Sequence, residues 1–193
     1  MLAYILTLGR LVLAAIFAGC VAFFVNHGQI SNTLAAALIV LAIIEELTDI
    51  FDGWAARRFG TVSQLGGILD PLVDSLARAT IYFTMAHAGW IPHAVPLVMI
   101  ARDIIVAYTR IANATVGAST SARVSGKIKA IIQGGAIPVV IAMAAPVVNG
   151  PLGPDTVNIL RLTAAGILIA ITVWSLFDYL CGAWPAIRRM KNL

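Results

Sequence analysis

Long apolar runs alternate with short polar breaks along the whole chain. The breaks contain residues that end helices, as in Asn26-His27-Gly28, Gly89-Trp90 and the Gly- and Pro-rich stretch 149–154. The runs are continuous and rich in Leu, Ile and Ala, whereas the strands of a membrane barrel would alternate over short segments. We therefore predict an all-α protein whose six apolar helices cover residues 4–25, 30–56, 67–88, 91–112, 127–148 and 157–182.

The composition places these helices in a membrane. Of the 193 residues, 60% are hydrophobic and 11% are charged, and the mean hydropathy is +0.93, well outside the range of soluble globular proteins. A membrane-spanning helix needs about 20 apolar residues, a length that each run provides. We expect a single transmembrane domain over residues 1–193, and we take the first run as a span because no basic segment precedes it.

The basic residues are concentrated in alternate breaks. Lys and Arg occur in the breaks near 57–66 and 113–127 and in the C-terminal tail, whereas 26–32, 88–93 and 148–156 contain none. Short cytoplasmic loops of membrane proteins collect Lys and Arg. We therefore expect both termini and both basic breaks to face the cytoplasm, in a bacterial-type inner membrane.

Four aspartates lie where the second and third apolar runs approach each other. Asp49 and Asp52 are three residues apart and Asp70 and Asp74 are four apart, so each pair lies on one face of its helix. The polar stretch 57–64 can turn the chain and bring the two pairs together. Like charges repel unless cations neutralise them, and hard oxygen ligands suit Mg²⁺, Mn²⁺ or Ca²⁺. Two divalent cations would balance four carboxylates.

Single aspartates in this group could have simpler roles. Asp70 precedes Pro71, as an N-cap residue precedes a proline at the first helical position, and Asp52-Gly53 could form a turn. These roles account for one aspartate at a time. They do not account for four aspartates in helical register beside an arginine and two glycines.

The segment from residue 49 to residue 74 matches the pattern D-x-x-D-G-x-x-A-R-x8-G-x3-D-x3-D without a gap or a substitution. In this feature the chain resembles the CDP-alcohol phosphatidyltransferases, integral membrane enzymes that transfer a phosphatidyl group from CDP-diacylglycerol to a small alcohol. The pattern fixes eight positions over 26 residues, which makes it far more specific than a lone glycine-rich motif. The fixed positions are Asp49, Asp52, Gly53, Ala56, Arg57, Gly66, Asp70 and Asp74.

The resemblance implies a role for each of these residues. The two metals, Mg²⁺ or alternatively Mn²⁺, would be held by Asp49, Asp52, Asp70 and Asp74, and Asp74 would also accept the proton of the acceptor hydroxyl. The CDP group would contact Asp52, Gly53, Ala56, Arg57, Gly66 and Asp70. Helix packing is an alternative reason for the two glycines. The resemblance also implies a homodimer. We expect it to be surrounded by membrane lipid and to have no nucleic-acid partner, and the distribution of Lys and Arg places its active site on the cytoplasmic side.

A second group of charged residues bears on the acceptor. Arg102 and Arg110 lie two helical turns apart on one face, and Lys127 and Lys129 begin the next apolar run on the same side of the membrane. Together these four cations could surround a phosphate. The stretch is similar to the phosphatidylglycerolphosphate synthases of the family, whose acceptor is sn-glycerol 3-phosphate. We therefore expect this acceptor and a product that is phosphatidylglycerol phosphate, with CMP released.

The chain agrees with that branch of the family only in part. In the N-terminal segment Thr7 and Arg10 match it, but Ala3 and Tyr4 stand where Pro and Asn are expected. Further along the chain, Ser75 follows Asp74 at a position where Lys is typical. Inositol phosphate, serine or another alcohol therefore stays open as the acceptor.

The charged residues also fit roles outside an acceptor site. Lys127 and Lys129 agree with the ordinary bias of cytoplasmic loops, and Arg102 could pair with Asp103. A divalent-cation transporter, from a different functional class, would also place aspartates in the membrane. Its pathway should have carboxylates at several depths, whereas only Asp103 and Asp178 lie in the membrane away from the cluster. A non-catalytic member of the family would be expected to lack a signature residue, and none is missing here.

Overall fold

The computed structural model describes residues 2–26, 30–58, 64–115 and 123–190, and within them the side chains of 9–24, 30–48, 70–115, 123–184 and 188. All secondary structure in these residues is helical. The helices are α1 (Leu2–Asn26), α2 (Asn32–Arg58), α3 (Gln64–His87), α4 (Ala94–Thr115), α5 (Val124–Ala144), α6 (Pro146–Leu152) and α7 (Pro154–Met190).

The predicted all-α class is confirmed for the described residues. Six long helices occupy the six predicted apolar runs, and α6 is a short additional helix in the predicted break near 148–156. Two boundaries differ in a way that matters for the site. α2 continues to Arg58 and α3 begins at Gln64, so both signature segments are helical.

The helix ends follow from local backbone chemistry. After α3, Gly89 adopts a φ of 74°, the left-handed region that glycine enters without steric cost. The N–H of Trp90 then donates to the carbonyl of Met85 at 2.9 Å and the N–H of Gly89 donates to Ala86 at 3.0 Å. These two bonds form a Schellman C-cap. After α5, Ala145 is extended because a proline follows it, and Pro146 begins α6.

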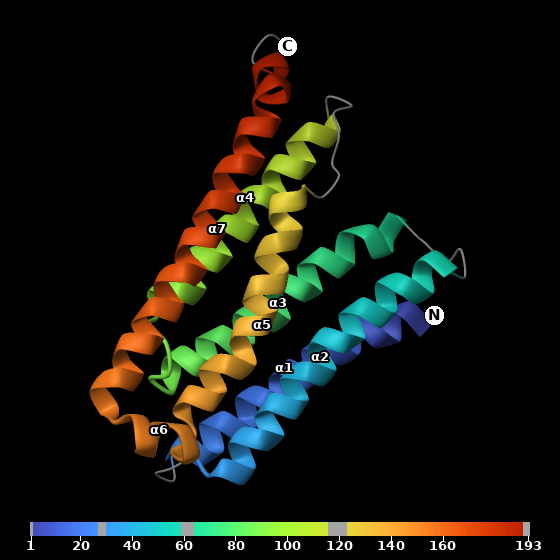
Figure 1. Ribbon diagram of the computed structural model, residues 1–193. Coiled ribbons are helices and arrows are strands. Elements are labelled where there is room, and N and C mark those ends of the chain that lie inside the picture. The colour runs from blue at the N-terminus through green and yellow to red at the C-terminus, as the bar shows by residue number, and fades with distance from the viewer. Residues whose placement is uncertain (1, 27–29, 59–63, 116–122, 191–193) are drawn as a thin grey trace.

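The long helices form a bundle in which successive helices run in opposite directions (Figure 1). α1 packs against α2 and α3, α7 packs against α4 and α5, and α2 contacts α5 where the two groups meet. The N-terminal ends of α1, α3 and α5 therefore point the same way as the C-terminal ends of α2, α4 and α7. α6 lies at the opposite end of the bundle. This arrangement agrees with the alternation of basic and non-basic breaks.

The centre of the bundle is apolar and closely packed. Small side chains such as Ala14, Ala35 and Ala77 are buried at the helix contacts, which lets the helices approach one another. Large side chains from five helices fill the remaining space, namely Phe17, Val21, Leu38, Ile81, Tyr82, Met85, Ile137, Ile141 and Leu168. This core supports the polar side chains that lie nearer the end with the signature residues.

The outer surface of the bundle suits a lipid environment. Among the described residues, two helical segments are long and apolar enough to cross a membrane: Val124–Ala144, with mean hydropathy 1.5, and Pro154–Trp184, with mean hydropathy 1.9. Large apolar side chains also point outward from other helices, for example Phe23 on α1 and Tyr108 on α4, which are 59% and 70% exposed. Such exposure is unfavourable in water and favourable in hydrocarbon.

Candidate active site

The signature residues lie on two consecutive helices at the same end of the bundle. Asp49, Asp52, Gly53, Ala56 and Arg57 belong to the last turns of α2, and Gly66, Asp70 and Asp74 belong to the first turns of α3. Both helix ends lie toward the right of Figure 1, and α1 packs against both α2 and α3. The two segments thus share one end of the bundle, and the convergence of their four carboxylates stays a prediction. The side chains of residues 49–57 and of Gly66 lie outside the described residues.

The simpler roles considered for single aspartates are wrong. Asp70 and Pro71 lie inside α3, two turns after its start at Gln64, so Asp70 does not cap the helix. Pro71 lacks a backbone N–H, so α3 has no hydrogen bond from residue 71 to the carbonyl of Gly67. Asp52 and Gly53 lie inside α2 and form no turn. Neither pair of aspartates is therefore accounted for by a helix end or by a turn.

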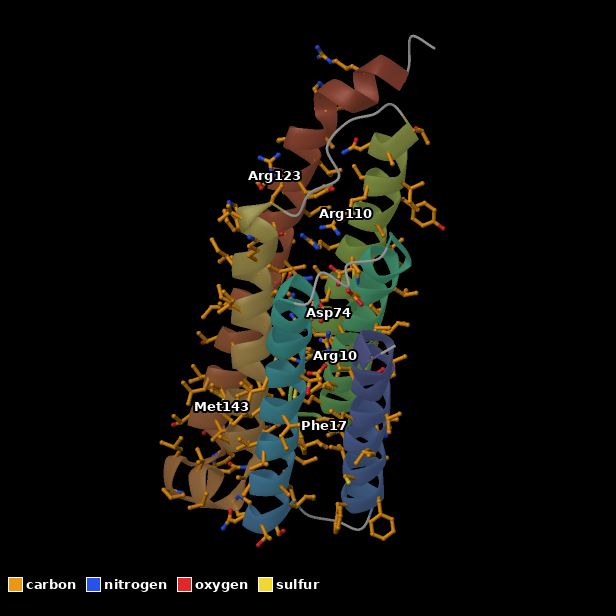
Figure 2. The ribbon with its side chains drawn as sticks, turned by 90° about the vertical axis from the view of Figure 1, so that its right-hand side faces the viewer. Arg10, Phe17, Asp74, Arg110, Arg123 and Met143 are labelled. Atoms are coloured by element: carbon orange, nitrogen blue, oxygen red, sulfur yellow. The ribbon has the colours of Figure 1, made fainter. Side chains whose placement is uncertain are left out.

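Asp74 is held by two arginines. Its Oδ1 accepts a hydrogen bond from Nη2 of Arg10 at 2.5 Å and lies 3.6 Å from Nη2 of Arg78. Figure 2 shows Arg10 on α1 and Asp74 on α3 side by side within the bundle. The side chain of Asp74 is 33% exposed. No hydrogen bond or ion pair joins its other oxygen, Oδ2, to any of the described side chains.

The two arginines are held in turn by glutamates of α2. Arg10 lies 3.6 Å from Oε1 of Glu45, and Nη2 of Arg78 lies 3.2 Å from Oε1 of Glu46. Nη1 of Arg78 also donates to the carbonyl of Ala130 on α5 at 3.2 Å. Sequence reasoning did not identify Glu45, Glu46 and Arg78 as part of the site. Their charge could have identified them, because a charged side chain inside an apolar run needs a partner of opposite charge.

The four carboxylates of the signature are chemically suited to bind divalent cations. Four carboxylates at the same end of α2 and α3 offer the hard oxygen ligands that Mg²⁺ and Mn²⁺ prefer. Asp70 is exposed and lies one turn before Asp74, whose side chain is partly exposed. Among the side chains that the structure describes, no three His, Cys, Asp or Glu residues form a group that could hold a metal. Asp49 and Asp52 are not among these side chains.

The four cations predicted to bind the acceptor divide into two pairs. In the first pair, Nζ of Lys129 donates to Oδ1 of Asp103 at 2.6 Å, and Nη1 of Arg102 donates to the same oxygen at 3.0 Å. Ser75 donates to the other oxygen of Asp103 at 3.0 Å, and Nη2 of Arg102 donates to Ser175 on α7 at 2.7 Å. Asp103, Arg102 and Lys129 therefore link α3, α4, α5 and α7, and the alternative pairing of Arg102 with Asp103 is observed.

The second pair, Arg110 and Lys127, has no carboxylate partner within the described part of the chain. Arg110 is half-buried, its guanidinium carbon lies 5.8 Å from the centre of the Tyr179 ring, and its Nε has no hydrogen-bond partner there. Lys127 is exposed in the first turn of α5. Figure 2 shows Arg110 nearer than Asp74 to the end of the bundle at which α7 terminates. Arg110 and Lys127 are thus the cations that remain available to an anionic ligand.

The two aspartates that lie inside apolar runs away from the cluster, Asp103 and Asp178, are engaged in structural pairs. Asp178 on α7 accepts from Nε of Arg123 at 2.9 Å and from the hydroxyl of Ser125 at 2.5 Å, and Asp103 is held by Lys129 and Arg102. An ion pathway needs carboxylates that can exchange their partners for the transported ion. These pairs favour the enzyme over the transporter.

Comparison with known proteins agrees with the signature. Residues 1–177 match the family model of the CDP-alcohol phosphatidyltransferases. A CDP-diacylglycerol–glycerol-3-phosphate 3-phosphatidyltransferase of Sodalis glossinidius is 34% identical over 185 residues, which is 92% of each chain. Proteins of the same name from Yersinia pestis and Pectobacterium atrosepticum are each 33% identical, covering 75% and 78% of this chain and 77% and 78% of their own. With the family match extending over both aspartate pairs and nearly all of the bundle, this chain is a member of the CDP-alcohol phosphatidyltransferase family and a phosphatidyltransferase.

Proposed function

We propose that this protein transfers the phosphatidyl group of CDP-diacylglycerol to sn-glycerol 3-phosphate. The observation that carries the choice of acceptor is the name of the Sodalis relative, which aligns with 92% of this chain. The available cations Arg110 and Lys127 support it, because an acceptor that already carries a phosphate gives them a partner. The products are phosphatidylglycerol phosphate and CMP.

In this reaction the acceptor hydroxyl oxygen attacks the β-phosphorus of the donor. The new phosphorus–oxygen bond replaces the bond to the CMP oxygen, CMP leaves as the anion, and the hydroxyl proton passes to Asp74. Asp49, Asp52, Asp70 and Asp74 would hold two divalent cations, Mg²⁺ or alternatively Mn²⁺. When bound, these cations would neutralise charge on the donor pyrophosphate.

The remaining signature residues would bind the nucleotide. Gly53, Ala56 and Gly66 are small, so CDP could lie close to the helix backbones. Arg57 carries a guanidinium that could pair with a phosphate oxygen, and Asp52 and Asp70 lie next to these positions along α2 and α3.

Acceptor-dependent release of CMP tests the proposal. The purified protein would be incubated with CDP-diacylglycerol and Mg²⁺ and offered glycerol 3-phosphate, inositol phosphate, inositol or serine. We expect CMP release with glycerol 3-phosphate and little with the others. Release with inositol phosphate alone would keep the phosphate site and change the acceptor, whereas release with serine alone would contradict the phosphate site.

We further propose that the six long helices all span an inner membrane with both termini in the cytoplasm. The distribution of Lys and Arg supports this orientation, and it puts the signature residues on the cytoplasmic side, where soluble glycerol 3-phosphate is available. The homodimer implied by the family resemblance belongs to the same proposal, and cross-linking in native membranes tests it.

Labelling of single cysteines tests the orientation. In a background where Cys20 and Cys181 are replaced by Ser, we expect Gly150→Cys on α6 to react with a membrane-impermeant thiol reagent added to intact cells. Thr115→Cys, at the end of α4, should react only after the cells are opened. Both positions are exposed, so accessibility alone does not distinguish them. The opposite labelling pattern would contradict the cytoplasmic site.

A further inference from the structure

Arg10, Glu45, Glu46, Asp74 and Arg78 form one connected set of ion pairs across α1, α2 and α3, which we call the charge network. Arg10, Glu45 and Arg78 are buried, with 2%, 2% and 5% of their surface exposed. Burying ion pairs contributes little to stability, because the cost of desolvation offsets their attraction. A buried set of this size beside a signature aspartate therefore calls for a functional role.

The charge network restrains Asp74 through one oxygen. Arg10 and Arg78 both contact Oδ1, from different helices, so rotation of the carboxylate would break two contacts at once. Oδ2 is left without a protein partner in the described part of the chain. The network thus keeps one oxygen in place and leaves the other for ligand binding and proton transfer.

Glu46 holds Arg78 in this position, and α5 provides the space that Glu46 needs. A Cβ atom added at Gly134 would lie 2.5 Å from the carboxyl carbon of Glu46 and 2.5 and 2.6 Å from its two oxygens. Gly134 is therefore required for the carboxylate to occupy its observed place. The neighbouring Gly135 differs, because a Cβ atom added there would meet nothing within 4 Å.

We propose that Glu46, seated against Gly134, is a positioning residue for Asp74. Glu46 fixes the guanidinium of Arg78, and Arg78 together with Arg10 fixes Oδ1 of Asp74, so that Oδ2 would be held ready to bind a metal ion and to accept the hydroxyl proton. The inference rests on the proposed metal-binding and proton-accepting role of Asp74. It extends that role to two residues outside the signature, one of them a glycine on another helix.

Gly134→Ala tests the inference, with Gly135→Ala as the matched control. The new methyl group displaces only the flexible end of Glu46, so the bundle should fold while the Glu46–Arg78 pair is lost. Partners that orient a metal ligand typically contribute 10- to 100-fold to activity or metal affinity, so we expect kcat to fall about tenfold. The KM for glycerol 3-phosphate should stay unchanged. Gly135→Ala should match the wild type.

Metal binding provides a readout that does not depend on turnover. Binding of Mn²⁺ to the purified protein, followed by electron paramagnetic resonance, should weaken about tenfold in Gly134→Ala and in Glu46→Gln. Arg78→Lys, which keeps a cation opposite Asp74, should bind Mn²⁺ more tightly than Arg78→Gln. A merely structural role would lower the melting temperature and the active fraction without changing the affinity of the folded protein for Mn²⁺.

The outcomes separate this inference from the proposed function. Wild-type kcat and Mn²⁺ affinity in both Gly134→Ala and Glu46→Gln would overturn the positioning role, even if Asp74→Asn is inactive. A loss of activity that only follows a loss of folded protein in both variants would overturn it as well. If Asp74→Asn keeps full activity, the proposed role of Asp74 itself is wrong.

Discussion

Asp70→Asn should reduce phosphatidyl transfer by at least about a hundredfold. The substitution keeps the size of the side chain and removes one negative charge from the proposed metal ligands. Changing a residue that only orients a metal ligand typically costs 10- to 100-fold, so loss of a ligand itself should cost more. The measurement is the initial rate of CMP release at saturating CDP-diacylglycerol and glycerol 3-phosphate, over a range of Mg²⁺ concentrations.

Asp155→Asn is the matched control for this experiment. Asp155 lies in the first turn of α7, at the end of the bundle away from the signature, and its side chain is exposed. The same loss of charge there should leave the rate unchanged. EDTA should abolish the activity of the wild type, and added Mg²⁺ should restore it. Wild-type turnover by Asp70→Asn, or undiminished turnover in EDTA, would contradict the metal site.

The helices could be predicted because hydrophobic length and glycine or proline breaks are local signals. Gly89 ends α3 and Pro146 separates α5 from α6, and both effects depend only on backbone geometry near one residue. The start of α3 was harder to predict. Asp70-Pro71 resembles a helix start, yet α3 begins at Gln64 and continues through Pro71, so this local pattern did not mark the helix boundary.

The pairing of charged side chains between helices could not be predicted in the same way. Which cation faces Asp103 depends on the relative rotation and height of α4 and α5, and no local pattern encodes these quantities. Sequence spacing placed Arg102 and Arg110 on one face of α4, but Arg102 bonds to Asp103 and Ser175 whereas Arg110 lies over Tyr179. The Glu46–Arg78 pair likewise depends on Gly134, more than 50 residues further along the chain than Arg78.

Arg110→Gln and Lys127→Gln should each raise the KM for glycerol 3-phosphate by about tenfold to a hundredfold. A hydrogen bond to a charged group contributes about 1.5–3 kcal/mol, which corresponds to that range in kcat/KM. The KM for CDP-diacylglycerol should change far less in both variants. Steady-state kinetics with each substrate varied in turn measures the two constants separately. Arg57→Gln should show the reverse pattern, because Arg57 is proposed to bind the donor.

The contrast with two other cations makes this test informative. Arg188→Gln removes a charge that lies over Trp184 near the end of α7, so a general effect of surface charge on an anionic substrate would appear there too. Arg102→Gln breaks the bonds to Asp103 and Ser175, so we expect it to lower the melting temperature and the active fraction more than it changes either KM. Suppose instead that Arg102→Gln alone raises the acceptor KM while Arg110→Gln and Lys127→Gln do not. The acceptor phosphate would then have to displace Asp103 from Arg102, and the available pair of cations would not be its binding site.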